Sequence, residues 1–258
     1  MICLDGLFRK GWKMNSGMYS AVSGNISTME KMDVITNNLS NINTYGFKKD
    51  RMIFESVLKN AKNPTQTGGS MTDGPVLTNF TVVTDFSPGP IKQTGNPLDI
   101  SLDGEGFFVV NTPNGKAYTR EGNFRLDSAN RIVSIEGYEL LGSGGPITVN
   151  GGKVEIDAKG AVSVDGQQVG TIDVVDFPKP YDLQKIGSTL FAPTDPNIAG
   201  QPAVNTSVKQ GSIEESNVQS IAEMVLLIEN SRTYDQCVKT IQSYDQMAAH
   251  ATNDLGKV

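Results

Sequence analysis

The distribution of proline divides this chain into two ends and a middle. All twelve prolines lie between Pro64 and Pro202, and most of the glycines lie in the same interval. Proline lacks a backbone donor and clashes with the preceding helical turn, so helix interiors exclude it. Both ends are therefore free to form long helices, whereas the middle favours short strands and turns. Helical ends without a core of their own are expected to pack against each other or against other copies of the chain.

The first end shows one apolar helical face between Asn15 and about Thr44. Apolar residues recur there every three or four positions, which is the period of an amphipathic helix. These residues are Met18, Val22, Ile26, Met29, Met32, Ile35, Leu39 and Ile42. Asn15 or Ser16 is a suitable N-cap, and Gly46 is suited to the left-handed turn that ends a helix. The segment is rich in Asn and Ser, so we expect marginal stability in isolation.

The second end predicts a helix from near Ser216, a candidate N-cap, to about Asn253. It carries two apolar stripes in different registers. The first stripe consists of Val218, Ile221, Val225 and Ile228. The second stripe consists of Met224, Leu227, Tyr234, Val238, Ile241 and Ala248. This spacing resembles that of a coiled-coil or bundle helix. The alternative is that both terminal helices pack on the central domain as ordinary core.

The middle of the chain predicts many short strands separated by turns. The expected strands are 98–102, 107–110, 131–135, 154–156, 161–164 and 172–175. The turn pairs between them are Asp103-Gly104, Asn114-Gly115, Asn150-Gly151 and Asp165-Gly166. This texture is typical of a mainly antiparallel β domain. The predicted fold class is α+β, in which the N- and C-terminal helices pair into a coiled-coil or bundle domain and the centre is a β domain.

These patterns divide the chain into five segments. Residues 1–13 lack helical periodicity and a cleavable signal pattern, so we expect a natural start at Met14, with a start-site extension or disordered tail before it. Residues 14–58 hold the first helix and a turn. Residues 59–92 are rich in Gly, Thr, Ser and Asn and are expected to form an extended irregular connector. Residues 93–212 form the β-rich domain, and residues 213–258 form the second helix.

Composition argues against several functional classes. A net charge of −6, without a Lys/Arg stripe, argues against nucleic-acid binding. Cys3, Cys237 and the single histidine, His250, supply neither a disulfide framework nor a metal site. A Ser/His/Asp hydrolase would have to use His250, and no nucleophile-elbow motif accompanies it. We therefore expect no enzyme activity, no cofactor and no metal.

A cluster of asparagines, Asn37, Asn38 and Asn41, stands at the end of the first helix. Asparagine lowers helix propensity, so the cluster has a cost. One explanation is a solvated helix end that prepares a turn. The other is that the side-chain amides bond to neighbouring chains and fix their register, as polar seam residues do in coiled coils. The residue pattern leaves both explanations open.

Three motifs, in order along the chain, resemble signatures of the bacterial flagellar rod and hook protein family. The first consists of residues 14–19 (MNSGMY) and 32–48 (MDVITNNLSNINTYGFK). The second consists of residues 93–100 (QTGNPLDI), 104–110 (GEGFFVV) and 118–124 (YTREGNF). The third consists of residues 215–218 (ESNV), 223–225 (EMV), 228 and 232–234 (RTY). Within the family, the chain length fits a rod component. Residues 14–19 and 144–149 (GGPITV) look most like the proximal rod type, with the distal rod or a hook-type subunit as the alternative.

The resemblance implies a structural subunit that polymerises through its terminal helices into the tubular rod of the basal body. Such a rod transmits torque from motor to hook and serves as an export channel. The implied partners are copies of the chain, other proximal and distal rod proteins, and the flagellar export apparatus, with no nucleic acid and no direct membrane insertion. The implied location is the rod across the periplasm, reached without a cleaved signal peptide. A β-rich glycan-binding module on a helical stalk and a hydrolase are the alternatives from other classes.

The surface expected to join the subunits comes from both terminal helices and from the turn after the first helix. Its residues are Met18, Val22, Ile26, Met29, Ile35, Asn37, Asn38, Leu39, Asn41, Ile42, Gly46, Phe47, Val218, Ile221, Val225, Ile228, Arg232, Val238 and Ile241.

Overall fold

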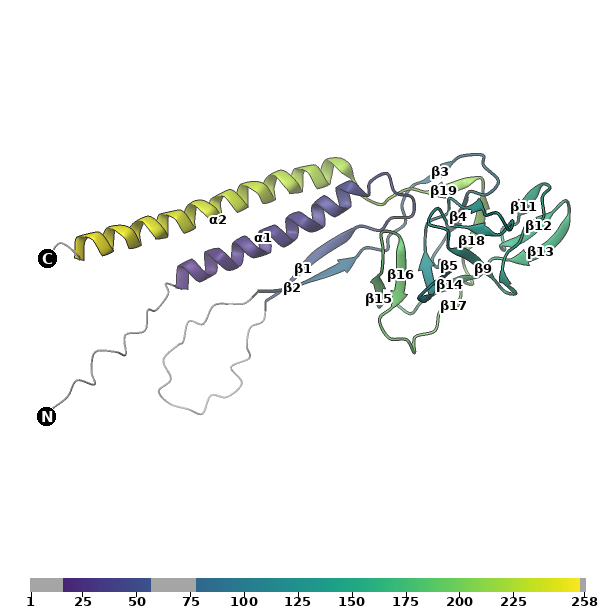
Figure 1. Ribbon diagram of the computed structural model, residues 1–258, viewed down its shortest axis with the longest axis horizontal. Helices are drawn as coiled ribbons and strands as arrows, with labels where there is room; N and C mark the ends of the chain where they lie inside the picture. Colours follow the sequence, from purple (N-terminus) through teal and green to yellow (C-terminus); the bar gives the residue numbers. More distant parts are fainter. Residues whose placement is uncertain (1–15, 57–77, 256–258) are drawn as a thin grey trace. The chain divides into compact units, whose positions relative to one another are not determined.

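Two compact units divide the residues described by the computed structural model, which are 16–56 and 78–255 (Figure 1). The first unit, here called the helical unit, contains residues 16–37, 50–56, 78–83 and 221–255. The second, here called the β unit, contains residues 38–49 and 84–220. The predicted leader at 1–13 lies outside the described residues. The same holds for residues 57–77 of the expected connector.

The helical unit consists of two long helices and a two-stranded sheet. The helices are α1 (Ser16–Ser40) and α2 (Ser220–Leu255), and the paired strands are β1 (Asp50–Ser56) and β2 (Thr78–Thr84). Helix α1 ends before the expected Thr44. The predicted cap Ser216 is wrong, because α2 begins four residues later and the Ser216 hydroxyl accepts from the Val218 amide at 3.3 Å instead.

Strands β1 and β2 occupy segments for which we expected other structure. Strand β1 lies within 14–58, expected as helix and turn, and β2 lies within 59–92, expected as an irregular connector. The β2 sequence, TNFTVVT, is rich in β-branched and aromatic residues, which favour strands. The Gly- and Asn-rich residues before it dominated the composition and hid this signal.

The β unit contains short strands throughout. Their bounds are β3 (Ile91–Gln93), β4 (Ile100–Asp103), β5 (Phe107–Thr112), β6 (Gly115–Thr119), β7 (Arg125–Leu126), β8 (Ile132–Val133), β9 (Glu139–Gly142), β10 (Gly145–Pro146), β11 (Val154–Ile156), β12 (Ala161–Val164), β13 (Gln167–Thr171), β14 (Val174–Asp176), β15 (Leu183–Lys185), β16 (Leu190–Pro193), β17 (Gln201–Pro202), β18 (Ser207–Gln210) and β19 (Ser212–Glu214).

One large sheet and three small ones organise these strands, and the described pairings among β3–β19 are antiparallel. The large sheet has ten strands in the order β15-β16-β6-β5-β9-β8-β7, with β10 beside β9, β14 beside β5 and β17 beside β14. The small sheets are β11-β12-β13, β18-β4 and β19-β3. A β-rich centre and two helices confirm the predicted α+β class.

Local sequence signals position several of these strands well. Strands β11 and β12 have the bounds expected from the sequence. The turn between β12 and β13 is the expected Asp165-Gly166 pair, with Val164 opposite Gln167. Both turn residues have positive φ, 49° and 84°, which is the requirement of a type I′ hairpin.

Two buried clusters form the core of the β unit. The larger is mostly aliphatic and gathers residues from both the large and the three-stranded sheets, including Val110, Leu140, Val149 and Val162. The smaller is aromatic and centres on Phe107, Phe177 and Phe191. Phe86 packs edge-on against Phe107, with ring centroids 5.6 Å apart. The core therefore reaches residue 86, which lies before the expected start of the β domain at residue 93.

Candidate assembly interface

Three residues of the first apolar stripe lie exposed on α2. Ile221, Val225 and Ile228 are 78%, 50% and 54% exposed. They recur at three- and four-residue spacing, so they share one face of the helix. Arg232 is exposed one turn further along. Scattered apolar residues are normal on a surface, but a continuous exposed stripe marks a site of interaction.

The second stripe of α2 is the more protected one. Leu227, Tyr234, Val238 and Ile241 are half-buried. The stripe loses its protection at its two ends, because Met224 and Ala248 are exposed. The two stripes therefore have different surroundings within one chain.

Helices α1 and α2 contact each other at two described points. The Asn230 amide nitrogen donates to the Thr28 carbonyl at 2.6 Å, and Asn230 is buried. A methyl group added at Gly24 would lie 3.7 Å from the Cys237 sulfur. Gly24 therefore brings the backbone of α1 close to the side chain of Cys237, and Asn230 ties the two helices by a polar contact.

The expected apolar face of α1 is divided between exposed and buried positions. Val22, Ile26 and Met29 are exposed, whereas Ile35 is buried. Met18 and Leu39 are half-buried. The apolar face of α1 is therefore exposed in the first half of the helix and is buried by the chain itself in the second half.

The residues predicted after α1, and Val218, lie largely inside the β unit. Asn38, Gly46, Phe47 and Val218 are buried by the chain itself, and their contacts in this structure are internal. Gly46 has the expected left-handed conformation, with φ at 68°.

The asparagine cluster at the end of α1 is only partly open to solvent. Asn37 is exposed, whereas Asn41 and Ile42 are half-buried. The Asn41 side-chain oxygen accepts from the Thr44 hydroxyl at 3.2 Å, a local contact of the kind that prepares a turn.

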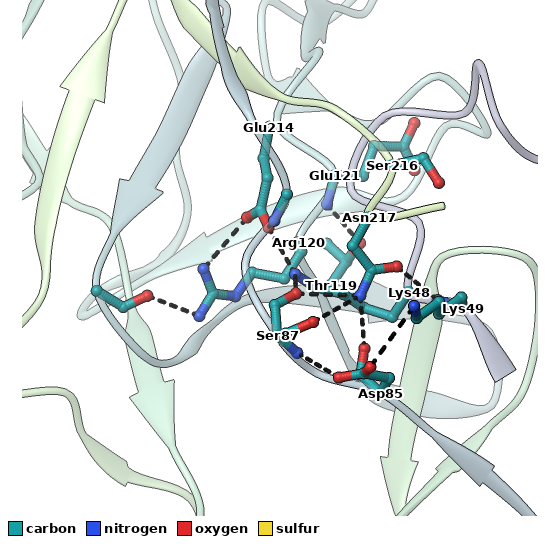
Figure 2. Close-up of polar contacts among 12 residues, drawn as sticks. Lys48, Lys49, Asp85, Ser87, Thr119, Arg120, Glu121, Glu214, Ser216 and Asn217 are labelled. Carbon is teal, nitrogen blue, oxygen red and sulfur yellow. Dashed lines mark hydrogen bonds and ion pairs between the residues drawn. The ribbon is translucent and has the colours of Figure 1, made fainter. Parts of the chain in front are cut away.

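A buried group of polar side chains stands where the β unit joins the rest of the chain. We call Lys48, Arg120, Glu214 and Asn217 the junction cluster (Figure 2). The Glu214 carboxylate binds the Lys48 ammonium at 2.5 Å and the Arg120 guanidinium at 3.2 Å. The Lys48 and Glu214 side chains are each only 1% exposed. One carboxylate thus lies between two cations with almost no access to water.

Further hydrogen bonds support these buried charges, although the Arg120 Nε atom has no hydrogen-bond partner among the described residues. Glu214 also accepts from the Gly89 amide at 2.8 Å, and Lys48 donates to the Ser87 carbonyl at 2.8 Å. Arg120 donates to the Gly104 carbonyl at 2.8 Å. Burial lowers the pKa of the Lys48 ammonium, and the attraction of Glu214 opposes this shift. An incompletely compensated buried charge is costly, so these contacts are expected to act as a unit.

Asn217 supplies the neutral part of the junction cluster. Its side-chain oxygen accepts from the Lys49 amide at 2.8 Å. Its side-chain nitrogen donates to the Asp85 carbonyl at 2.8 Å and to the Ser87 carbonyl at 3.1 Å. The amide side chain supplies both the acceptor and the donors that these contacts require.

Sequence reasoning gave no role to any of the four junction residues. Lys48, Arg120 and Asn217 lie inside the quoted motifs, whereas Glu214 lies just before one. A lysine and a glutamate 166 positions apart give no local signal that they pair. The nearest hint was Gly46, whose need for a left-handed turn marks a place where the backbone passes close to another segment.

His250, the single histidine of the chain, is exposed on α2. Among residues 16–56 and 78–255, no three His, Cys, Asp or Glu side chains lie together as metal ligands. Over the same residues, the structure has no helix that is both long enough and apolar enough to span a membrane.

Three family models match this chain in sequence order. The model of the flagella basal body rod protein matches residues 18–48. The model of the flagellar hook protein FlgE/F/G D1 domain matches residues 101–164. The model of the flagellar basal body rod FlgEFG protein C-terminal region matches residues 209–254. The matches therefore include both helices and the centre of the β unit.

Several curated proteins are similar to the chain over almost its full length. The flagellar basal-body rod protein FlgF of Caulobacter vibrioides is 33% identical, over 95% of this chain and 100% of that protein. The flagellar basal-body rod protein FlgG of Bacillus subtilis is 33% identical, over 93% and 99%. The FlgF protein of Rhizobium meliloti is 31% identical, over 94% and 99%.

Proposed function

The chain belongs to the flagellar basal-body rod protein family, and from this premise we propose how its copies join. It is a structural subunit of the basal-body rod, and the family is structural, not enzymatic. In our proposal the exposed apolar stripes of α1 and α2 are buried by neighbouring subunits, either copies of this chain or other rod proteins. The subunits would then form a tubular shaft that crosses the periplasm, carries torque from motor to hook and encloses an export channel.

The exposed stripe Ile221, Val225 and Ile228 is the observation that carries this proposal. Burial of apolar surface contributes roughly 25 cal/mol per Å². A single chain leaves this contribution unused on α2, and also at Val22, Ile26 and Met29 of α1. In this proposal, contacts between copies at these faces are heterologous and their rotation does not close a ring, so they build a helical polymer.

In this proposal α1 and α2 pair as a coiled coil or bundle within each subunit. The contact between Asn230 and Thr28 supports the pairing, as does the approach of Gly24 to Cys237. The half-buried second stripe of α2 would face α1, and the first stripe would face the neighbouring subunit. Asn37, exposed at the end of α1, is the member of the asparagine cluster best placed to contact another chain.

We further propose that the subunit is delivered by the flagellar export apparatus without a cleaved signal peptide. Marginally stable ends favour passage through a narrow channel, because they order fully only when they meet the growing rod. We place the chain in the proximal part of the rod because of residues 14–19 and 144–149. Relatives named FlgF and FlgG match at the same identity, so direct localisation in isolated basal bodies is the test of proximal against distal.

Replacement of Ile228 by aspartate tests the interface. Ile228 is about half exposed, so Ile228→Asp is expected to change the stability of the monomer by no more than about 0.5 kcal/mol. In a strain without the native gene, the variant should abolish swimming and be missing from isolated basal bodies. Thr233→Asp is the matched control, because it adds the same charge at an exposed site of α2, about 140° around the helix. Normal motility with Ile228→Asp would contradict the interface.

A further inference from the structure

The β unit connects to the helical unit through segments that the junction cluster binds together. The chain passes between the two units after residues 37, 49, 83 and 220. Lys48 and Lys49 directly precede one of these crossings, and Asp85 follows another. Asn217 comes shortly before the last. The cluster thus draws together three segments that are distant in sequence but share this position in the topology.

Neutral hydrogen bonds join the three segments pairwise. The Asp85 amide donates to the Lys49 carbonyl at 2.8 Å, which ties the first segment to the second. Asn217 accepts from the Lys49 amide and donates to the Asp85 carbonyl, which ties the third segment to both. Figure 2 shows the Asn217 side chain between Lys49 and Asp85. Loss of this one side chain removes its contacts with the first and second segments at once, while the Gly46 amide still donates to the Glu214 carbonyl.

The buried charges join the same segments a second time. Glu214, shortly before Asn217, holds Lys48 of the first segment and the Gly89 amide of the second. Arg120 links this carboxylate to the end of β6 in the large sheet. The side chain of Arg120 is 5% exposed, and its guanidinium lies 5.5 Å from the centre of the Phe107 ring. The junction is therefore anchored in the core of the β unit.

We propose that the junction cluster is a positioning device for assembly, in which Asn217 and Lys48 hold the chain connections of the helical unit together before the subunit meets the rod. This inference rests on the proposed function, since it concerns polymerisation through α1 and α2. A free subunit with a closed junction has the segments that follow α1 and precede α2 already joined. It therefore enters the polymer without the entropic cost of gathering them.

The energetic consequence is a shift in the subunit concentration that assembly requires. Apparent affinity falls in proportion to the fraction of subunits in the competent state. If an open junction leaves one subunit in ten competent, assembly needs about tenfold more subunit. A larger supply of the variant subunit then restores rods, whereas a defect in the interface itself persists at every practical dose.

The experiment compares Asn217→Leu with Lys92→Met in cells that lack the native gene and express each chain from a titratable promoter. Asn217→Leu removes the neutral links at similar side-chain volume. Lys92→Met is the matched control, because Lys92 pairs with Glu215 at 3.5 Å beside the junction while its side chain is 56% exposed. The readout is the amount of chain at which half of the cells carry hooks. We expect a rise of about tenfold for Asn217→Leu and none for Lys92→Met.

Hydrogen exchange on the purified monomers shows whether the junction has opened. With Asn217→Leu, the amides of Lys49 and Asp85 should lose protection, while those of strands β5 and β6 keep it. Unchanged protection of the Lys49 and Asp85 amides would overturn the proposal. So would a loss of their protection in a variant that still supports hooks at the same amount of chain as the wild type. If Asn217→Leu keeps the protection of β5 and β6, a defect that no dose rescues would overturn it as well.

A second variant covers the case in which Asn217→Leu does not fold. Lys48→Met keeps the volume of the buried side chain and leaves Glu214 with Arg120 and the Gly89 amide. The same dose shift and the same rescue are then expected of Lys48→Met, and their absence overturns the proposal. Ile228→Asp, measured in parallel, tests the proposed interface separately from the proposed role of the junction cluster. Normal assembly with Ile228→Asp would contradict the interface, whatever the junction variants do.

Discussion

Gly46 shows how a single residue permits the junction to form. Its amide donates to the Glu214 carbonyl at 2.8 Å, and its φ is 68°. A methyl group at this position would lie 2.3 Å from the Glu121 amide nitrogen and 2.4 Å from the Arg120 carbonyl carbon. Both contacts are with backbone, which has no room to move aside. Only glycine therefore allows the segment after α1 to lie against the end of β6.

Gly46→Ala should destabilise the β unit by at least about 2 kcal/mol, since backbone clash adds to the strain of a positive φ. Gly95→Ala is the matched control, because Gly95 has φ at 76° and nothing within 4 Å of an added methyl group. Gly95→Ala should lower the free energy of unfolding by only about 1 kcal/mol, which is the strain of the positive φ alone. Urea unfolding of both variants gives the comparison, and equal losses would show that the close approach costs nothing.

Glu121 gives the β unit a pH dependence of predictable sign. Burial raises the pKa of its carboxyl above the ordinary value, and the hydrogen bond from the Thr189 hydroxyl, at 2.8 Å, opposes this shift. The folded-state pKa therefore lies above the unfolded one. The stability that this group contributes is complete below the unfolded pKa, near 4.3, and is lost as the pH rises through the folded pKa.

Glu121→Gln should remove this loss of stability at high pH. A neutral amide is buried at lower cost than a carboxylate, and its oxygen still accepts the hydrogen bond from the Thr189 hydroxyl. At pH 7 we expect the variant to be more stable than the wild type by on the order of 1 kcal/mol, and near pH 4 the difference should shrink. Urea unfolding at both pH values is the measurement. Glu155→Gln, at an exposed site on β11, should change little at either pH. A Glu121→Gln variant that loses stability at pH 7 contradicts the sign.

At the scale of elements, the sequence predicted best where a segment and its partner are close along the chain. Strands β11 and β12 and the Asp165-Gly166 turn follow from alternation and turn chemistry within about a dozen residues. Both helices follow from their period, with errors of a few residues at their ends. Strands β1 and β2 were missed, because the Gly- and Asn-rich residues between them obscured a short β-branched signal.

The candidate interface was predictable only as a set of apolar stripes. Periodicity identified Ile221, Val225 and Ile228, but it cannot tell which stripe a helix turns inward. The structure separates an exposed stripe from a half-buried one on α2. The junction cluster could not be predicted, because Lys48 and Glu214 resemble ordinary surface charges until a fold joins two distant segments.

Asn230 is the polar contact on which the pairing of α1 with α2 can be tested. Asn230→Asp replaces the donor to the Thr28 carbonyl by a carboxylate that faces a carbonyl oxygen. We expect a loss of about 2 kcal/mol and lower helicity by circular dichroism. Asn253→Asp makes the same change at an exposed site of α2 and should cost no more than a few tenths of a kcal/mol. Equal effects of the two variants would mean that the buried contact does not hold the helices.

At the scale of the whole molecule, two units that differ in their buried cores share one chain. The β unit has two buried clusters and a junction of paired charges, whereas α1 and α2 carry exposed apolar faces. Isolated helices are marginal in water without tertiary packing. A chain of this construction is expected to keep its β unit folded while its helices respond to assembly.

A dilute monomer should therefore show less helix by circular dichroism than α1 and α2 together contain, and its helicity should rise on incorporation into a polymer. The near-ultraviolet signal of the aromatic cluster around Phe107 should be the same in both states and serves as the internal control. Analytical ultracentrifugation verifies the monomer. Complete helicity in that monomer would exclude coupled folding of the ends.

The long sequence separation between Lys48 and Glu214 also sets an order of events in time. The two residues are 166 positions apart. A polypeptide made or delivered from its N-terminus presents the lysine early and the glutamate late. Hairpins such as β5–β6 can form as soon as their own residues are free, but the ionic contact has to wait for almost the entire chain. A truncated or stalled polypeptide that ends before Glu214 thus has no means of completing the junction, and only a nearly full-length molecule can join the segment after α1 to the segment before α2.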